Sequence, residues 1–282
     1  MPKVAIVTDS TANLPQIFID QYAISVMPQT LILDNKIYRD LIDIQPLEFY
    51  QRLANSKSMP TTSQASPEDF KTSYRSLLEH GCDILAILIS SKLSGTCQSA
   101  EQARLEFPGA HIEVIDSEAA SLALGWQVLT AARAAAAGAS IADCVAVAQK
   151  ARQNSGVYFV VDTLEFLHRG GRIGGGARFL GTALNLKPIL ELRAGRIEPV
   201  ERVRTQRKAF TRLLELLAER LSGRKQIRLG ILDANNPEAA KYLREQVEQI
   251  FHPEEIIQNP VSPAIGAHAG PGTVGIAFLS GM

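Results

Sequence analysis

The first half of the chain alternates short apolar runs with segments that carry helix-capping signals. Apolar runs typical of buried strands occupy residues 4–7 and 83–89. Ser66–Asp69 and Ser140–Asp143 each place a serine three residues before an acid, which is the pattern of a capped helix start. Such alternation builds a parallel sheet with helices on both faces. We therefore expect residues 1–155 to form a parallel three-layer α/β domain.

The second half of the chain carries a different signal. Residues 187–192 and 197–203 have the pattern of two strands joined by a tight turn, which predicts a β-hairpin. Amphipathic helices predicted at residues 206–221 and 237–251 alternate with further strands. Antiparallel pairing thus enters here, and we expect residues 156–282 to form a mixed-sheet two-layer α/β domain.

The composition limits what this chain can do. Its 282 residues include 29 Lys plus Arg and 29 Asp plus Glu, so the formal net charge is zero. A dedicated nucleic-acid binder needs surplus positive charge, and we therefore expect no nucleic-acid partner. No apolar run reaches the roughly 18 residues of a membrane span, and the N-terminus has no signal-peptide core, which predicts a cytoplasmic protein without a membrane span. Cys82, Cys97 and Cys144 are widely spaced and are expected to be reduced thiols.

Two loops are rich in hydroxyl side chains. Residues 59–66 include Thr62 and precede a capped helix, so their simplest role is capping. Residues 90–96 lie between a buried strand and a helix start, where free backbone N–H groups and the helix dipole favour an anion. Ligands also bind at such strand ends in open parallel sheets. The simpler interpretation is that Ser94 only caps its helix.

A third segment, residues 266–275, contains four glycines and one proline. This composition predicts a loop that needs close backbone approach or unusual dihedral angles. His268 lies within it and could donate a hydrogen bond to an anion or act as a base, although a lone histidine more often has a structural role.

Positive charge is concentrated between His168 and Arg212, where 11 Lys and Arg face 3 Asp and Glu, an excess of 11 − 3 = +8. The simplest interpretation is a solvated basic face. The alternative is a surface that docks an anionic ligand or an acidic protein. The glycine run at residues 170–176 resembles a dinucleotide-binding fingerprint only loosely, because no strand is predicted before it.

Familiar enzyme signatures are missing from the sequence. There is no G-x-S-x-G elbow, no H-E-x-x-H and no histidine pair at ligand spacing, so we expect neither a metal site nor a cofactor. Two alternatives stay open. One is a hydrolase or acyltransferase that uses Ser94 and His268, with residues 90–96 as an oxyanion hole. The other is a nucleotide- or phosphate-binding protein that uses Gly174–Gly176 and its basic neighbours.

Five separated motifs, in this order, resemble the DegV family of bacterial fatty-acid-binding proteins. They are Asp9-Ser10-Thr11-Ala12, Thr62-Ser63-Gln64, Ser91-Lys92-Leu93-Ser94-Gly95-Thr96, Asp162-Thr163-Leu164-Glu165 leading into Gly170-Gly171-Arg172-Ile173, and His268-Ala269-Gly270-Pro271-Gly272-Thr273. The resemblance covers essentially the whole chain. It implies a parallel α/β domain followed by a mixed α/β domain, with one long-chain fatty acid bound between them.

The resemblance also implies roles for individual residues. Thr62 and Ser94 would hold the fatty-acid carboxylate, with the Gly95 N–H close by and His268 near the head group. The chain would then be a lipid-binding protein rather than an enzyme, with the fatty acid as its ligand and no cofactor.

Arg172 and Arg204 match positions that the family associates with docking to a separate fatty-acid kinase. That kinase would phosphorylate the carboxylate to an acyl phosphate, a step in phospholipid metabolism. Two residues depart from the family pattern: Ala65 stands where proline is common, and Cys97 where an aromatic residue is common. We expect these two positions to bear on loop stiffness and pocket shape, and so on acyl-chain preference.

Overall fold

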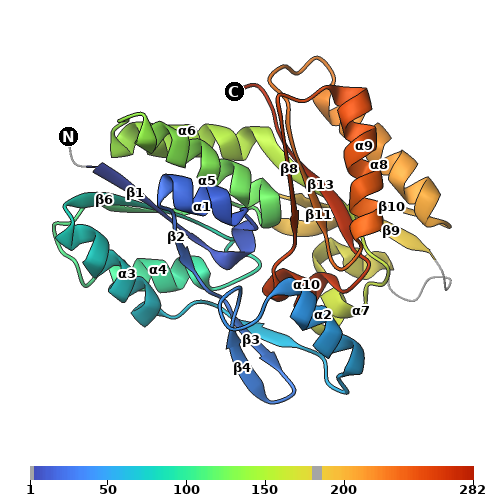
Figure 1. Cartoon of the computed structure of the whole chain (residues 1–282), viewed down its shortest axis with the longest axis horizontal. Coiled ribbons are helices and arrows are strands. Elements are labelled where there is room, and N and C mark those ends of the chain that lie inside the picture. Colours follow the sequence, from blue (N-terminus) through green and yellow to red (C-terminus); the bar gives the residue numbers. More distant parts are fainter. Residues whose placement is uncertain (1–2, 180–185) are drawn as a thin grey trace.

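The structure is a computed structural model that describes residues 3–179 and 186–282 (Figure 1). Met1, Pro2 and residues 180–185 of the basic segment lie outside the described residues. The chain first builds a parallel sheet with the strand order β2-β1-β6-β7. Its strands are β1 (Lys3–Asp9), β2 (Ser25–Met27), β6 (Cys82–Leu88) and β7 (Ile112–Asp116). The predicted parallel α/β architecture of the first half is confirmed.

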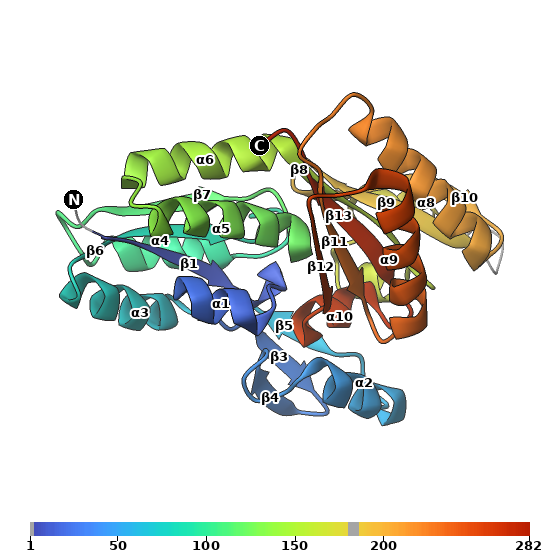
Figure 2. The same ribbon diagram turned by 45° about the horizontal axis from the view of Figure 1, so that its top comes forward.

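Helices cover both faces of the parallel sheet (Figures 1 and 2). On one face lie α3 (Pro67–Glu79) and α4 (Thr96–Arg104), and on the other lie α1 (Gln16–Tyr22), α5 (Ser121–Ala136) and α6 (Ile141–Asn154). Alternation along β6 explains this, because Ile84 and Ala86 pack toward α3 and α4 while Leu85 and Ile87 pack toward α5 and α6. The predicted serine caps are confirmed: Ser66 and Ser140 each accept a hydrogen bond from the backbone N–H three residues later.

A small antiparallel sheet with the order β4-β3-β5 projects from the first half. It consists of β3 (Thr30–Leu33), β4 (Lys36–Arg39) and β5 (Thr61–Ser63), and α2 (Pro46–Asn55) lies between β4 and β5 in the chain. Our expectation that antiparallel pairing begins only in the second half was wrong. These strands have three or four residues each, too few to show a periodicity, and β5 pairs with β3 across a long stretch of chain. Asp34 and Asn35 form the β3–β4 turn with positive φ at both positions.

The second half builds a mixed sheet with the order β10-β9-β8-β13-β11-β12. Its strands are β8 (Ser155–Val160), β9 (Lys187–Arg193), β10 (Arg196–Val203), β11 (Arg228–Asp233), β12 (Glu255–Pro260) and β13 (Val274–Leu279). β11 and β12 are parallel and the other neighbours are antiparallel. The predicted β9–β10 hairpin is confirmed. Helices α8 (Gln206–Leu221) and α9 (Pro237–Phe251) cover one face, as predicted for a two-layer domain.

The other face of the mixed sheet packs against α5, which therefore lies between the parallel sheet and the mixed sheet. One hydrophobic cluster joins α5 to residues of both, including Leu85, Trp126, Val157 and Leu279. Close approach also explains a glycine inside this helix, since a Cβ on Gly125 would lie 2.6 Å from the Ala12 carbonyl oxygen. The chain crosses between the sheets where α6 meets β8, and the 155/156 domain boundary stays a prediction.

Three short helices lie beside the mixed sheet: α7 (Glu165–Arg169), the 3₁₀ helix η2 (Gly174–Phe179) and α10 (Pro263–Ala269). The expectation of a loop over residues 266–275 was wrong for its first four residues, which complete α10. Ser262 caps this helix and Pro263 occupies its first turn. Gly266 fits the helix because it packs closely against Tyr50. Within residues 3–179 and 186–282, no helix combines the length and apolar character that crossing a bilayer requires.

Candidate functional site: a cavity with one polar end

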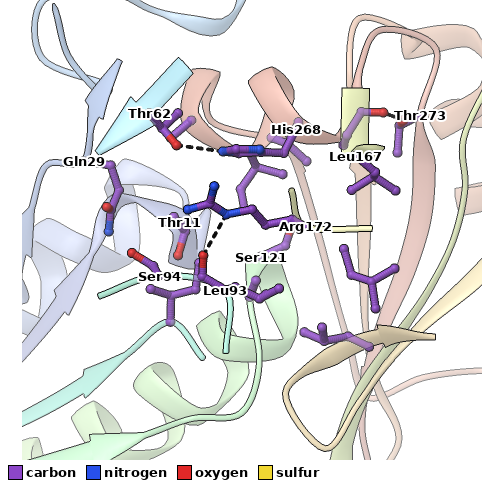
Figure 3. A pocket seen from close by; sticks show the side chains of 18 of the residues that line it. Thr11, Gln29, Thr62, Leu93, Ser94, Ser121, Leu167, Arg172, His268 and Thr273 are labelled. Atoms are coloured by element: carbon purple, nitrogen blue, oxygen red, sulfur yellow. Dashed lines mark hydrogen bonds between the residues drawn. The ribbon is translucent and has the colours of Figure 1, made fainter. Parts of the chain in front are cut away.

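A cavity lies between the parallel sheet and the mixed sheet, bounded also by β5 and α10 (Figure 3). The space between its walls is about 920 Å³, including solvent at the mouth. Most of the wall is apolar, with Ile89 and Leu93 on one side and Val157, Phe159 and Leu232 on the other. A predominantly apolar lining of this kind suits an apolar ligand.

Polar side chains from segments distant in the sequence meet in this cavity. Thr62 comes from β5, Ser94 from the loop before α4, Arg172 from the segment after α7, and His268 from α10. Thr62 Oγ1 lies 2.7 Å from His268 Nε2, and this contact joins the small sheet to α10 (Figure 3). Three of the four predicted head-group residues, Thr62, Ser94 and His268, therefore line one cavity.

His268 is neutral at pH 7. Burial, with a smaller contribution from the nearby Arg172 guanidinium, lowers the pKa of His268 to about 4. His268 Nδ1 is buried and has no hydrogen-bond partner in the described chain. Because a buried N–H without an acceptor is rarer than a buried acceptor without a donor, the ring proton belongs on Nε2. His268 then donates to Thr62 Oγ1, and the Thr62 hydroxyl proton is free for a third group.

Arg172 lies in the cavity wall, with its guanidinium between the Thr62 side and the Ser94 side (Figure 3). Its Nε donates to the Leu93 carbonyl at 3.0 Å, and its Nη1 donates to the Gly170 carbonyl at 2.7 Å. The sequence motif predicted a kinase-docking role for Arg172. It did not predict that Arg172 lies in the cavity wall, because the turn at Gly170 and Gly171 determines where this side chain lies. The docking role stays a prediction.

The interpretation of Ser94 as a helix cap was wrong. Gly95 is the N-cap residue of α4, and no described side chain caps this helix. The Ser94 hydroxyl instead lies 2.8 Å from Thr96 Oγ1. Gly95 itself packs against Gln64, which lines the cavity, and a Cβ on Gly95 would lie 3.1 Å from the Gln64 amide nitrogen. The backbone N–H groups in the first turn of α4 are thus uncapped by side chains, and this turn follows directly on Ser94, which lines the cavity, whereas Gly95 itself is not part of the lining.

Sequence reasoning missed Gln29, which also lines the cavity and whose Nε2 donates to Thr96 Oγ1 at 2.9 Å. It belongs to the region of short strands for which no periodicity was visible. Thr11 was quoted only as part of a motif, yet it too lines the cavity. Its place in the polar turn directly after β1 was the available signal.

The basic segment has two distinct parts. Arg204 follows β10 and is exposed, away from the cavity lining. Arg212 instead contacts three glutamates, Glu201, Glu215 and Glu219, so part of the predicted positive excess is neutralised locally. A docking role for Arg204 stays a prediction.

The two alternative functions find little support in this geometry. A hydrolytic dyad needs His268 to contact Ser94, but His268 Nε2 contacts Thr62 and Ser94 contacts Thr96. A phosphate site at Gly174–Gly176 is unfavourable, because Gly174 and Gly175 pack against β10 and the Glu198 carboxylate lies directly beside Gly175. No group of three metal-ligating side chains occurs in the part of the chain that the structure describes.

Ala65 and Cys97, the two departures from the family pattern, belong to the core between α3, α4 and the parallel sheet. Neither belongs to the cavity lining. Burial raises the pKa of the Cys97 thiol to about 12, so this cysteine is a thiol at neutral pH. Any effect of these residues on acyl-chain preference would therefore be indirect.

Comparison with known proteins shows the relationships of the chain. A family model described as "Uncharacterised protein, DegV family" matches residues 3–281. A DegV domain-containing protein of Streptomyces coelicolor is 37% identical over 279 residues, 98% of each chain. A solved fatty-acid-binding DegV family protein from Thermus thermophilus has a TM-score of 0.94 at 43% identity, over 99% of each chain. DegV of Bacillus subtilis, described as a fatty acid binding protein, has a TM-score of 0.89 at 33% identity, over 100% of each chain. This chain therefore belongs to the DegV family.

Proposed function

We propose that this protein binds one long-chain fatty acid in the cavity and presents its carboxylate to a separate fatty-acid kinase. The observation that carries the proposal is a cavity that is apolar along most of its wall and polar at one end, where Thr62, Ser94, Arg172 and His268 meet. The fatty-acid binding of the structural relatives supports the same ligand class.

The apolar wall supplies most of the binding free energy. Each buried methylene contributes about 0.8 kcal/mol, so about ten methylenes contribute about 8 kcal/mol, which corresponds to micromolar affinity. The head-group contacts then have to replace the water lost by the carboxylate and fix its position, which a few hydrogen bonds can do.

The carboxylate would accept hydrogen bonds from the Thr62 and Ser94 hydroxyls, with the Gly95 N–H near the start of α4. His268 would act through Thr62, to which it donates. Arg172 adds a positive charge beside the head group, and its Nε and Nη1 donate to the Leu93 and Gly170 carbonyls, which fixes the guanidinium in the cavity wall. A carboxylate oxygen would attack the γ-phosphorus of ATP held by the kinase, with ADP leaving and an acyl phosphate forming.

Docking of the kinase would place its ATP at the mouth of the cavity. Arg172 lines the cavity and would lie beside the head group, and the exposed Arg204 offers a positive charge to an acidic partner surface. Arg172→Ala and Arg204→Ala should each slow acyl-phosphate formation by the kinase, while retention of fatty acid by Arg204→Ala should be unchanged.

Native mass spectrometry of the freshly purified protein, followed by solvent extraction, tests the ligand assignment. We expect a mass increment that matches one long-chain fatty acid, and extraction should identify its chain length. A protein that arrives empty and takes up no added fatty acid would contradict the proposal. Turnover of an activated acyl ester, lost in Ser94→Ala and in His268→Ala, would establish the hydrolase instead.

A further inference from the structure

We propose that Gln29 is a positioning residue for the head-group site: its amide fixes the direction of the Thr96 hydroxyl, which in turn makes Ser94 a hydrogen-bond donor to the ligand. The inference rests on the proposed binding of a carboxylate at this end of the cavity. It assigns a role to Thr96, which contacts Ser94, and to Gln29, which contacts Thr96.

The three side chains form a short chain of contacts. Gln29 Nε2 donates to Thr96 Oγ1 at 2.9 Å, and Thr96 Oγ1 lies 2.8 Å from Ser94 Oγ. Gln29 Oε1 is farther from the same oxygen, at 3.4 Å, so the amide nitrogen is the closer partner. Thr96 is fully buried and Gln29 is 4% exposed, which removes water as a competing partner.

Proton counting then sets the direction of this chain. A hydroxyl has one proton to donate, and Thr96 already accepts from the Gln29 amide. Two acceptors lie within reach of the Thr96 proton, Ser94 Oγ at 2.8 Å and Gln29 Oε1 at 3.4 Å, and the shorter contact directs it to Ser94. With that bond accepted, the Ser94 proton is left for the carboxylate in the cavity. If Ser94 instead donated to Thr96, only the lone pairs of the Ser94 oxygen would face the anion.

The surroundings hold the Gln29 amide in this orientation. Burial raises the pKa of Asp9, and the Ile89 and Thr11 hydrogen bonds and the Gln29 side chain oppose that shift, as a nearby amide donor does. The Gln29 backbone is fixed as well, because its N–H donates to Ser10 Oγ at 3.1 Å and its carbonyl accepts from Asp40 N–H at 2.8 Å.

The same network reaches the opposite side of the head-group site. Ser10 Oγ donates to Asp40 Oδ2 at 2.6 Å, and Asp40 Oδ1 accepts from the Ala264 N–H in the first turn of α10. Because α10 carries His268, buried hydrogen bonds join the helix behind the Thr62 hydroxyl to the glutamine behind the Ser94 hydroxyl. Thr62 therefore accepts a hydrogen bond from His268, and Ser94 accepts one from Thr96. The proton of each of these two hydroxyls stays free for the ligand.

Carbon-13 NMR of palmitic acid labelled at its carboxyl carbon measures the predicted effect. The delipidated wild type, Gln29→Met and Ser94→Ala would be titrated with this probe, and its bound carboxyl pKa and dissociation constant recorded. Met keeps the approximate length of Gln and removes its donor. We expect Gln29→Met to raise the bound carboxyl pKa and to weaken binding about fivefold, since a hydroxyl free to turn away from the anion loses part of one hydrogen bond.

A double-mutant cycle separates positioning from a general structural role. In a Ser94→Ala background, Gln29→Met should have no further effect on the dissociation constant, because the group through which Gln29 acts is gone. An equal cost in both backgrounds, or an unchanged carboxyl pKa in Gln29→Met, would overturn the inference. Failure of the wild type to bind the probe would instead overturn the proposed function.

The chain offers a matched control and a second route. Gln127 is another buried glutamine, whose amide donates to Ser117 and Ser155 outside the cavity, and Gln127→Met should leave the carboxyl pKa unchanged. If Gln29→Met does not fold, Thr96→Ser and Thr96→Val decide the question. The serine variant keeps the hydroxyl and should bind like wild type, whereas the valine variant should show the raised carboxyl pKa. Equal behaviour of these two variants would overturn the inference.

Discussion

The two hydroxyls proposed to bind the carboxylate, those of Thr62 and Ser94, are supported in different ways. Thr62 lies against His268, an ionisable side chain on a short helix. Ser94 lies against Thr96, which in turn contacts Gln29, and these two residues are buried and do not ionise. We call these the histidine arm and the glutamine arm. Both leave a hydroxyl proton for an anion, but only the histidine arm contains a titratable side chain. Similar donor geometry can thus come from partners with very different sensitivity to their surroundings.

Removing both hydroxyls tests whether the arms together hold the head group. Thr62→Val combined with Ser94→Ala should weaken binding of a long-chain fatty acid more than 100-fold, because each lost hydrogen bond to a charged group costs about 1.5–3 kcal/mol. Competition with a fluorescent fatty-acid analogue measures this. The corresponding fatty alcohol, which has no charge, is the control ligand and should lose much less affinity. Equal losses for acid and alcohol would show that the arms do not read the carboxylate.

The histidine arm should make stability depend on pH. The pKa of His268 is about 4 in the folded protein against 6.5 ordinarily, so the unfolded chain takes up this proton first as the pH falls. Stability from His268 is complete above pH 6.5 and is lost between pH 6.5 and 4, by about 3 kcal/mol.

Urea unfolding of wild type and His268→Gln between pH 6.5 and 4 gives the difference between their free energies of unfolding. Glutamine keeps a donor for Thr62 and does not titrate, so the loss should be smaller in the variant. Asp40, whose pKa burial raises to about 6, titrates in the same window with the opposite sign, which is why the difference between the two proteins is the readout. If the free energy of unfolding depends on pH in the same way in wild type and variant, His268 does not cause the pH dependence.

Substitution of Gly170, which lies beside His268, or of Gly95, which follows Ser94, tests each arm without changing its side chains. A Cβ on Gly170 would collide with His268 Nδ1. Gly170→Ala should displace the imidazole, break its contact with Thr62 and weaken fatty-acid binding about tenfold. Isothermal titration calorimetry checks this, with circular dichroism to confirm the fold. Wild-type affinity in this variant would show that His268 does not support Thr62.

Gly95 gives the smallest expected effect. Its φ is negative, and a Cβ there would lie 3.1 Å from the end of the flexible Gln64 side chain, which can move by a few tenths of an ångström. Gly95→Ala should therefore keep affinity within about twofold of wild type. The same calorimetric titration serves, and a loss as large as that of Gly170→Ala would mean that the Gly95 position itself is part of the carboxylate site.

Local signals in the sequence predicted much of the fold. The bounds expected for α8 and α9 were confirmed at both ends, because the caps Thr205 and Asn236 and the apolar stripes that follow act within one helix. The β9–β10 hairpin was predicted for the same reason, since Ala194 and Gly195 make its turn locally. The small sheet was missed because its pairing depends on strands too short to carry a pattern.

The sequence by itself determined the two α/β halves and the capped helices, and motifs resembling the DegV family predicted Thr62, Ser94 and His268 as head-group residues. Only the tertiary structure decided how these residues are arranged around one cavity. It placed Arg172 in the cavity wall, paired Thr62 with His268 and put Gln29 behind Ser94. Helix caps and turns depend on neighbours in the chain. Hydrogen bonds between residues tens to hundreds of positions apart depend on how the sheets and α10 pack together.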